Sequence, residues 1–242
     1  MAPKRIIAIL LATLVIAAPA LADKPDPAAD KTRTLFVTVG EDRLRFEIPE
    51  GMCFADQSNR QQGAMLDLIR RALAHKGDEH LLGLFMPCES IANPGNPMAR
   101  EGRVPTIGII LWPHKIEDAV AHGSSAQYLD WRAPSYREYA ALNLPVWMLA
   151  ADPLRQSGDT VKDPELSTEV TRSTHALMTT FSQYLSADGQ PFQTVGATGT
   201  LLAKGHPIEI AVRLNGASGI TTTDQAHDFM KKFMDLQGEI NR

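Results

Sequence analysis

Histidine and serine side chains are the first candidates for chemistry in this sequence. The seven histidines lie at positions 75, 80, 114, 122, 175, 206 and 227. None of them occurs in H-E-x-x-H or H-x-H spacing, which would bring two imidazoles together around a zinc ion. We therefore predict no metal site and no cofactor.

Motifs for a nucleophile or a nucleotide are also missing. The sequence lacks G-x-S-x-G, and Gly216-Ala217-Ser218-Gly219 places its serine in an expected turn before the last helix. It also lacks a Walker A loop and G-x-G-x-x-G. No catalytic residue is predicted, although a hydrolase with a site assembled from distant residues, such as His114, His175 or His206, stays an alternative.

A cluster of aromatic residues is the main candidate for binding. Three of the four tyrosines and two of the three tryptophans fall in one short stretch, at Tyr128, Trp131, Tyr136, Tyr139 and Trp147. Such side chains supply rigid, amphipathic contact area, so they could line a groove for a peptide, a sugar or an apolar ligand. The other interpretation is that they form the core between a helix and a sheet, with their hydroxyls reaching the surface.

The two cysteines, Cys53 and Cys88, form a predicted disulfide, because the N-terminal sequence places them in an oxidising compartment. Two buried thiols are the alternative. Closing a loop of this length would stabilise the fold by about 3.8 kcal/mol in the chain-entropy model. The spacing does not fit a C-x-x-C redox motif, so the bond is expected to be structural.

Residues 1–22 have the pattern of a cleavable signal peptide. Lys4 and Arg5 precede an apolar run that is too short to span a bilayer, and Ala20-Leu21-Ala22 resembles a cleavage site. We expect the mature chain to begin at Asp23, to be soluble without stable membrane insertion, and to be periplasmic or secreted. Residues 23–31 read as a flexible leader.

The charge of the chain argues against nucleic acid as a partner. The formal net charge is −4, and it becomes −6 when the two charges of Lys4 and Arg5 are lost. Phosphate binding needs clustered basic residues, which this sequence lacks. The expected partner is therefore an envelope protein or a small ligand.

Apolar periodicity indicates the elements that must position these residues. Residues 33–48 alternate as a strand hairpin, 60–76 have the period of a helix, and 81–86 and 106–112 are short apolar runs typical of buried strands. Residues 88–105 read as a long loop, because they are rich in Pro and Gly. Residues 116–142 read as helical, with a cap at Ser124 or Ser125.

The C-terminal third predicts more antiparallel strands and a final helix. The range 171–185 is ambiguous, and the Asp188-Gly189 turn signal after it favours a strand. Strands over 192–202 and 207–214 flank Lys204-Gly205. Thr222 with Gln225 can form a capping box for an amphipathic helix whose stripe is Phe229, Met230, Phe233, Leu236 and Ile240.

Taken together, these patterns predict a single α+β domain over residues 32–242. Its core is a mainly antiparallel sheet covered by helices, with a long C-terminal amphipathic helix. The order of strand, strand, Phe46-Glu47-Ile48-Pro49-Glu50-Gly51 and helix, followed by a closing hairpin and helix, resembles small exported proteins of the Mog1/PsbP-like type. That resemblance covers about residues 33–112 and 190–242, and it implies an accessory or binding role. A non-catalytic binding protein of the periplasm is accordingly the leading hypothesis.

Overall fold

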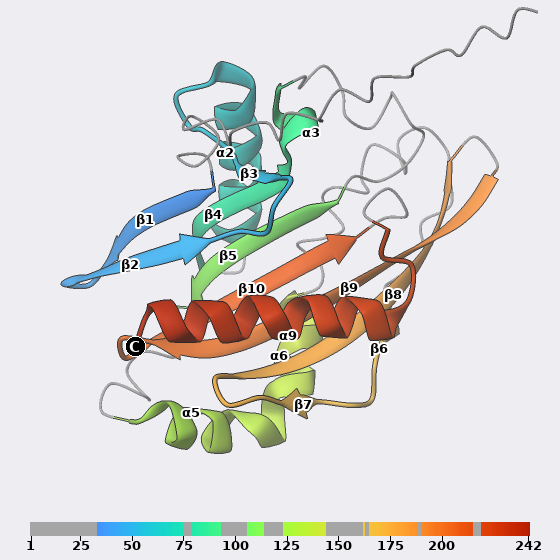
Figure 1. The fold of residues 1–242 in the computed structure, drawn as a ribbon. Coiled ribbons are helices and arrows are strands. Elements are labelled where there is room, and N and C mark those ends of the chain that lie inside the picture. The colour runs from blue at the N-terminus through green and yellow to red at the C-terminus, as the bar shows by residue number, and fades with distance from the viewer. Residues whose placement is uncertain are drawn as a thin grey trace, which may run out of the picture.

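The computed structural model shows an α+β fold, as the sequence predicts (Figure 1). It describes residues 33–74, 79–92, 106–113, 123–143, 162, 165–187, 190–214 and 219–242. The predicted signal peptide and leader, Trp147, and the histidines at 75, 114 and 122 lie outside these residues.

Strands contribute more residues to the described chain than helices do. They are β1 (Thr34–Val39), β2 (Asp42–Glu47), β3 (Met52–Phe54), β4 (Glu79–Pro87), β5 (Ile107–Pro113), β6 (Glu165–Leu166), β7 (Thr171–Arg172), β8 (Ala176–Ala187), β9 (Gln190–Ala203) and β10 (His206–Leu214). The helices are α2 (Arg60–Ala74), α3 (Cys88–Ala92), α5 (Ser125–Arg132), α6 (Tyr136–Asn143) and α9 (Thr223–Ile240), with the 3₁₀ turn η1 (Ala133–Ser135) between α5 and α6.

The main sheet has the order β3-β4-β5-β10-β9-β8-β6, and β7 also pairs with β8. Every pairing in it is antiparallel. The turn between β9 and β10 contains Lys204 and Gly205, both with positive φ, as a tight two-residue hairpin turn often requires. The ambiguous range 171–185 is strand except at residues 173–175, which connect β7 to β8, and β8 pairs with β9 along its whole length.

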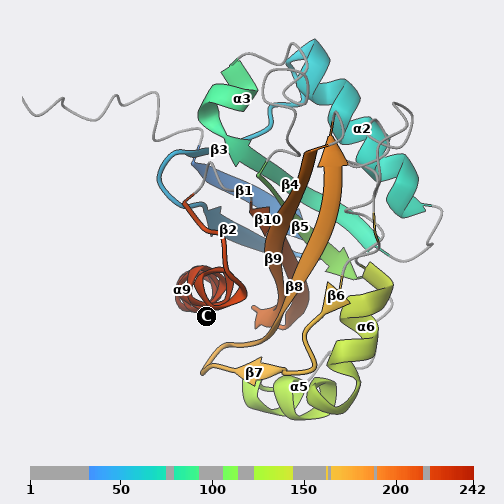
Figure 2. The same ribbon diagram turned by 90° about the vertical axis from the view of Figure 1, so that its right-hand side faces the viewer.

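One face of the sheet is covered by α9 and by the separate β1–β2 hairpin (Figure 2). The hairpin alternates as predicted, and its inward residues Val39, Leu44 and Phe46 are buried in the same core cluster as Met230 and Phe233 of α9. The helix and the hairpin therefore share one apolar layer over the sheet.

Helix α9 begins with the predicted capping box, in which Thr222 and Gln225 bond each other's backbone N–H groups. Its buried face is rotated from the predicted stripe. Leu236 is exposed, whereas Met234 and Gln237 are fully buried. The prediction for Leu236 was wrong because Gln237 is drawn inward by backbone groups of β2, which a hydrophobicity pattern does not record.

The opposite face of the sheet is covered by α2 at one end and by α5 and α6 at the other (Figure 2). Leu66, Ile69 and Leu73 of α2 pack on the strands β4 and β5. The helix begins at residue 60, as predicted, and its predicted end at residue 76 lies outside the described residues.

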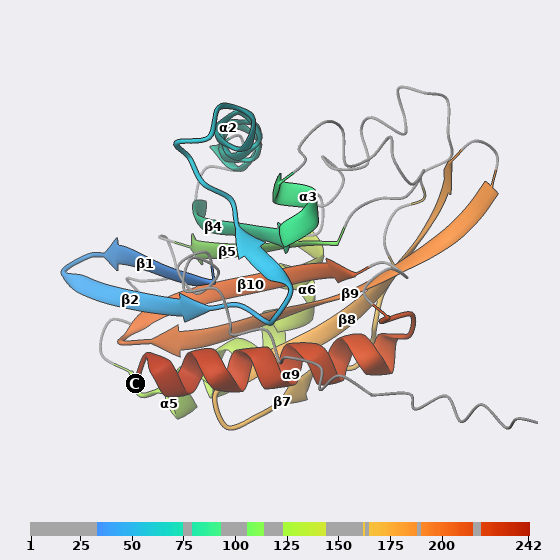
Figure 3. The same cartoon turned by 45° about the horizontal axis from the view of Figure 1, so that its top comes forward.

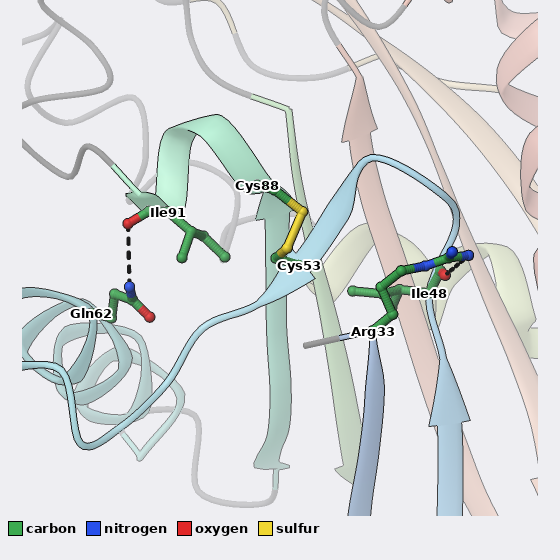
Figure 4. Close-up of a disulfide and its surroundings, with 6 residues drawn as sticks. All are labelled: Arg33, Ile48, Cys53, Gln62, Cys88 and Ile91. Carbon is green, nitrogen blue, oxygen red and sulfur yellow. Dashed lines mark hydrogen bonds between the residues drawn. A yellow bond between two sulfur atoms is a disulfide. The ribbon is translucent and has the colours of Figure 1, made fainter. Parts of the chain in front are cut away.

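The predicted disulfide between Cys53 and Cys88 is present, with its Cα atoms 4.8 Å apart (Figure 4). It joins β3 to the first residue of α3, next to the strand pair that holds Cys53 opposite Met86. The prediction of a loop beginning at residue 88 was wrong for 88–92, which are helical. Close by, the Gln62 side chain of α2 donates to the Ile91 carbonyl of α3 at 3.2 Å and ties the two helices together.

Candidate functional site

The aromatic candidates lie on α5, η1 and α6. Ser124 caps α5 in a reciprocal box with Gln127, and Pro134 replaces a continuous helix by the short 3₁₀ turn. That turn keeps α5 and α6 adjacent (Figure 1). Side chains of both helices therefore reach one region of the sheet.

Tyr128 and Tyr136 point into the protein. Both side chains are buried, and their hydroxyls bond the threonine side chains of β9: Tyr128 contacts Thr200, and Tyr136 lies 3.5 Å from Thr198. The part of the core interpretation that expected these hydroxyls at the surface was wrong. The two tyrosines fasten the helices to the sheet by a polar contact at the end of each ring.

The threonines belong to what we call the buried polar strip, which consists of Thr198, Thr200, Glu209 and Arg213. In the register of β9 and β10, Thr200 lies opposite Glu209, and Arg213 lies opposite Gly196. All four side chains are at most 5% exposed. The strip therefore lies inside the protein, between the sheet and the elements that cover it.

Burial and the nearby Glu209 carboxylate raise the pKa of Tyr128 and of Tyr136 well above the ordinary value for tyrosine, because both disfavour a phenolate. Both phenols are therefore neutral at physiological pH, and they act as hydrogen-bonding groups and not as bases. Burial lowers the pKa of Arg213 to about 9, which still leaves its guanidinium charged near neutral pH.

Arg132 lies at the end of α5 and is also buried. Its Cζ atom is 3.5 Å from the centre of the Tyr139 ring and 5.7 Å from that of Trp131. Within the described chain, its Nε and Nη2 atoms have no hydrogen-bond partner. Stacking on Tyr139 is therefore the contact that fixes the orientation of this guanidinium.

Trp131 differs from its neighbours because it is 48% exposed. Besides packing on the sheet, α5 and α6 make polar contacts at the protein surface. Asp130 pairs with Arg172 of β7, and Arg137 of α6 donates to the Ser167 carbonyl at 3.1 Å. The structure thus brings Tyr128, Trp131, Tyr136 and Tyr139 into one region, but it divides them between the core and the surface.

Of the three histidines named for a hydrolase, His114 lies outside the described residues, and His175 and His206 have different partners. His175 contacts Arg242 at 3.0 Å, and His206 bonds Asp42 at 3.1 Å. Ser173 next to His175 donates to Asp235 and accepts from two backbone N–H groups, which is the pattern of a structural turn.

A hydroxyl–imidazole contact does occur at His227, which sequence reasoning did not single out. Its Nε2 lies 2.8 Å from Thr171 Oγ1, and its Nδ1 lies 3.6 Å from a carboxylate oxygen of Asp228. The two partners come from β7 and from the same helix, so no spacing motif could have found them.

Glu209, Arg213 and the two threonines were also not predicted as site residues. Glu209 and Arg213 alternate with Ile208, Ile210 and Val212, which places the two charged residues on the same face of the strand. In a sequence, however, such alternation usually indicates that the polar face is exposed to water.

The described residues contain no cluster of three or more side chains suited to a metal ion. None of the helices among them is long and apolar enough to cross a membrane. No protein-family model, curated protein or solved structure matches the chain. The similarity to Mog1/PsbP-like proteins therefore stays a prediction from the sequence.

Proposed function

We propose that this protein is a non-catalytic binding or accessory protein of the cell envelope, and that α5 presents Trp131 as the anchor for an envelope-protein partner. The supporting observation is the contrast within one turn of helix. Trp131 is 48% exposed, while Tyr128 and Arg132 on either side are buried.

That contrast suits binding for a physical reason. Trp, Tyr and Arg dominate the energetics of protein interfaces, and an anchor binds more tightly when it does not have to be ordered first. The Trp131 ring already contacts the Tyr128 ring, with 6.2 Å between centroids, and lies near the Arg132 guanidinium. The adjacent Asp130 supplies an exposed polar side chain beside it, as in the rim of an interface.

Export is part of the same proposal. The Cys53–Cys88 disulfide supports an oxidising compartment, because disulfides persist there and are rare in reducing ones. The signal-peptide pattern predicts Asp23 as the first residue of the mature protein. Intact-mass analysis of the protein recovered from the periplasm tests this, and recovery of the uncleaved chain in the membrane fraction would contradict it.

The test of binding uses a deletion strain with an envelope phenotype. Trp131→Ala should leave folding within about 1 kcal/mol of the wild type, because the side chain is half exposed, and yet weaken complementation. Tyr184→Ala is the matched control, since Tyr184 is also about half exposed and lies near the cationic side chain of Lys162. Equal complementation by both folded variants would remove Trp131 from the proposal.

A hydrolase is the second candidate, and the contact between Thr171 and His227 is the observation that favours it. A hydroxyl within 2.8 Å of an imidazole is the first requirement of an activated nucleophile. Asp228 is 76% exposed, however, so it is a weak group for orienting the ring. Ester hydrolysis by the wild type that is lost in folded His227→Ala or His206→Ala would move this candidate ahead.

A further inference from the structure

The β1–β2 hairpin is a two-stranded sheet of its own, and its two outer edges differ in the contacts that their backbone groups make. Figure 3 shows β1 on the side of the hairpin away from α9. A Cβ atom added at Gly83 would lie only 2.8 Å from Leu35 Cδ2, so β1 packs closely over β4. The outer edge of β1 therefore lies above the rim of the main sheet and not above its centre.

The backbone groups at the outer edge of β2 are hydrogen-bonded by side chains at the C-terminal end of α9 and in the β9–β10 turn. Asn241 accepts from the Arg45 N–H at 2.9 Å and donates to the Arg45 carbonyl at 2.7 Å. Gln237 does the same for Glu47, at 3.2 and 2.8 Å. Lys204 Nζ donates to the Arg43 carbonyl at 3.1 Å. Two buried amides and one lysine thus close this edge against further pairing.

No side chain of the described residues bonds the outer edge of β1 in this way. Thr34, Phe36 and Thr38 lie opposite Glu47, Arg45 and Arg43, the three residues whose backbone groups point away from the hairpin. In an antiparallel ladder both members of such a pair point away from each other, so these three residues present their N–H and C=O groups outward. Among the described strands, only β2 pairs with β1.

The sequence of β1 suits further pairing. Thr-Leu-Phe-Val-Thr-Val consists of strong strand formers and has no charge, no proline and no bulge. Natural sheets usually protect an open edge with one of those devices. Phe36 is 51% exposed, and the Arg43 guanidinium lies 4.4 Å from the centre of its ring.

We propose that the outer edge of β1 pairs with the β1 edge of a second copy of this chain, antiparallel and with Phe36 of both copies on the two-fold axis. In this register Thr34 lies opposite Thr38 of the second copy. The three outward residues of each strand then exchange about six main-chain hydrogen bonds. The two Phe36 rings become a cross-strand pair, a favourable contact on a sheet surface.

Charge complementarity favours the second copy and the antiparallel direction. Glu47 lies beside Thr34, and Arg43 lies beside Thr38. Pairing Thr34 with Thr38 of the second copy therefore places Glu47 of one copy and Arg43 of the other in the same row across four strands, in both outer rows, while the central row places Arg45 in line with Arg45. A parallel pair in register would place like charges in line in all three rows, which is less favourable. The interface is small, so the dimer should be weak and concentration-dependent.

Sedimentation of the purified protein over a range of concentrations tests the dimer. Phe36→Lys places two like charges on the axis and should raise the dissociation constant at least about tenfold. Leu68→Lys on α2 is the matched control, because Leu68 is also 51% exposed, and it should sediment as the wild type does. A wild type that is monomeric at every concentration overturns the proposal and leaves an extended peptide of another protein as the occupant of this edge.

Cross-linking tests the register. Paired residues of an antiparallel ladder lie about 5.5 Å apart at Cα, within the range that a disulfide can bridge. Phe36→Cys should therefore form a covalent dimer under mild oxidation. Thr34→Cys should not, because its two copies are separated by four residues along the strand, roughly 13 Å. Cross-linking of both variants to the same extent, or of neither, contradicts this arrangement.

Discussion

The contact between Tyr128 and Thr200 is the most informative one to perturb, because it distinguishes a structural anchor from a ligand site. Both side chains are buried, and their hydroxyls bond each other. Tyr128→Phe leaves the Thr200 hydroxyl inside the protein without that partner. Leaving a buried polar group unsatisfied costs about 1 to 3 kcal/mol, and we expect Tyr128→Phe and Thr200→Val each to destabilise the fold by this amount.

The two changes should not be additive. When both hydroxyls are removed, no polar group is left without its partner, so the double variant should be more stable than the sum of the single effects by about 1 kcal/mol. Urea unfolding at 25 °C measures all four free energies of unfolding. Equal m-values across the set establish that the unfolding transition is the same in each variant.

Tyr136 and Thr198 provide the control. Their hydroxyl oxygens are 3.5 Å apart, at the outer limit for a hydrogen bond. The same cycle on this pair should give a coupling energy below about 0.5 kcal/mol. Additive effects of Tyr128→Phe and Thr200→Val, to within about 0.3 kcal/mol, would refute the reasoning, because the buried hydroxyls would then not depend on each other.

Three further predictions concern the core, the disulfide and the response to pH. Phe233 is 3% exposed and packs edge-on against the Phe85 ring, whereas Phe229 is only partly buried, so Phe233→Ala should cost about 3 to 5 kcal/mol and Phe229→Ala clearly less; thermal melts that rank them the other way would contradict the position of α9. Native protein should contain no free thiol, and a Cys53→Ser/Cys88→Ser variant should lose up to about 3.8 kcal/mol of stability in urea; two titratable thiols in denatured wild type would exclude the bond. Burial and, to a lesser degree, Glu209 raise the pKa of Tyr128 in the folded state, so its contribution to stability is fully present below the ordinary tyrosine pKa of about 10 and is lost as the pH rises above it. Tyr128→Phe should therefore reduce the loss of stability at alkaline pH. An identical alkaline pH dependence of the free energy of unfolding in both proteins would contradict the shift.

Much of the fold could be predicted because its signals are local. Alternation over 43–48 identifies a strand with one apolar face, and Thr222 with Gln225 marks the start of α9 through bonds made within one turn. The disulfide was predictable as well, since only one pairing is possible between two cysteines. The apolar periodicity of the last helix wrongly predicted that Leu236 is buried, because burial there depends on which face of α9 the hairpin contacts.

The sequence by itself determined the long alternating strands, the start of the final helix and the concentration of aromatic residues between 128 and 147. Only the tertiary structure decided which of those residues are buried. Tyr128 and Trp131 are three residues apart on one helix, yet the sheet covers the first and leaves the second half exposed. Glu209 and Arg213 alternate with apolar neighbours as residues in water do, and they are buried because elements distant in sequence cover that face of the sheet. Alternation separates the two faces of a strand, but whether a polar face meets water depends on long-range packing, which no local pattern encodes.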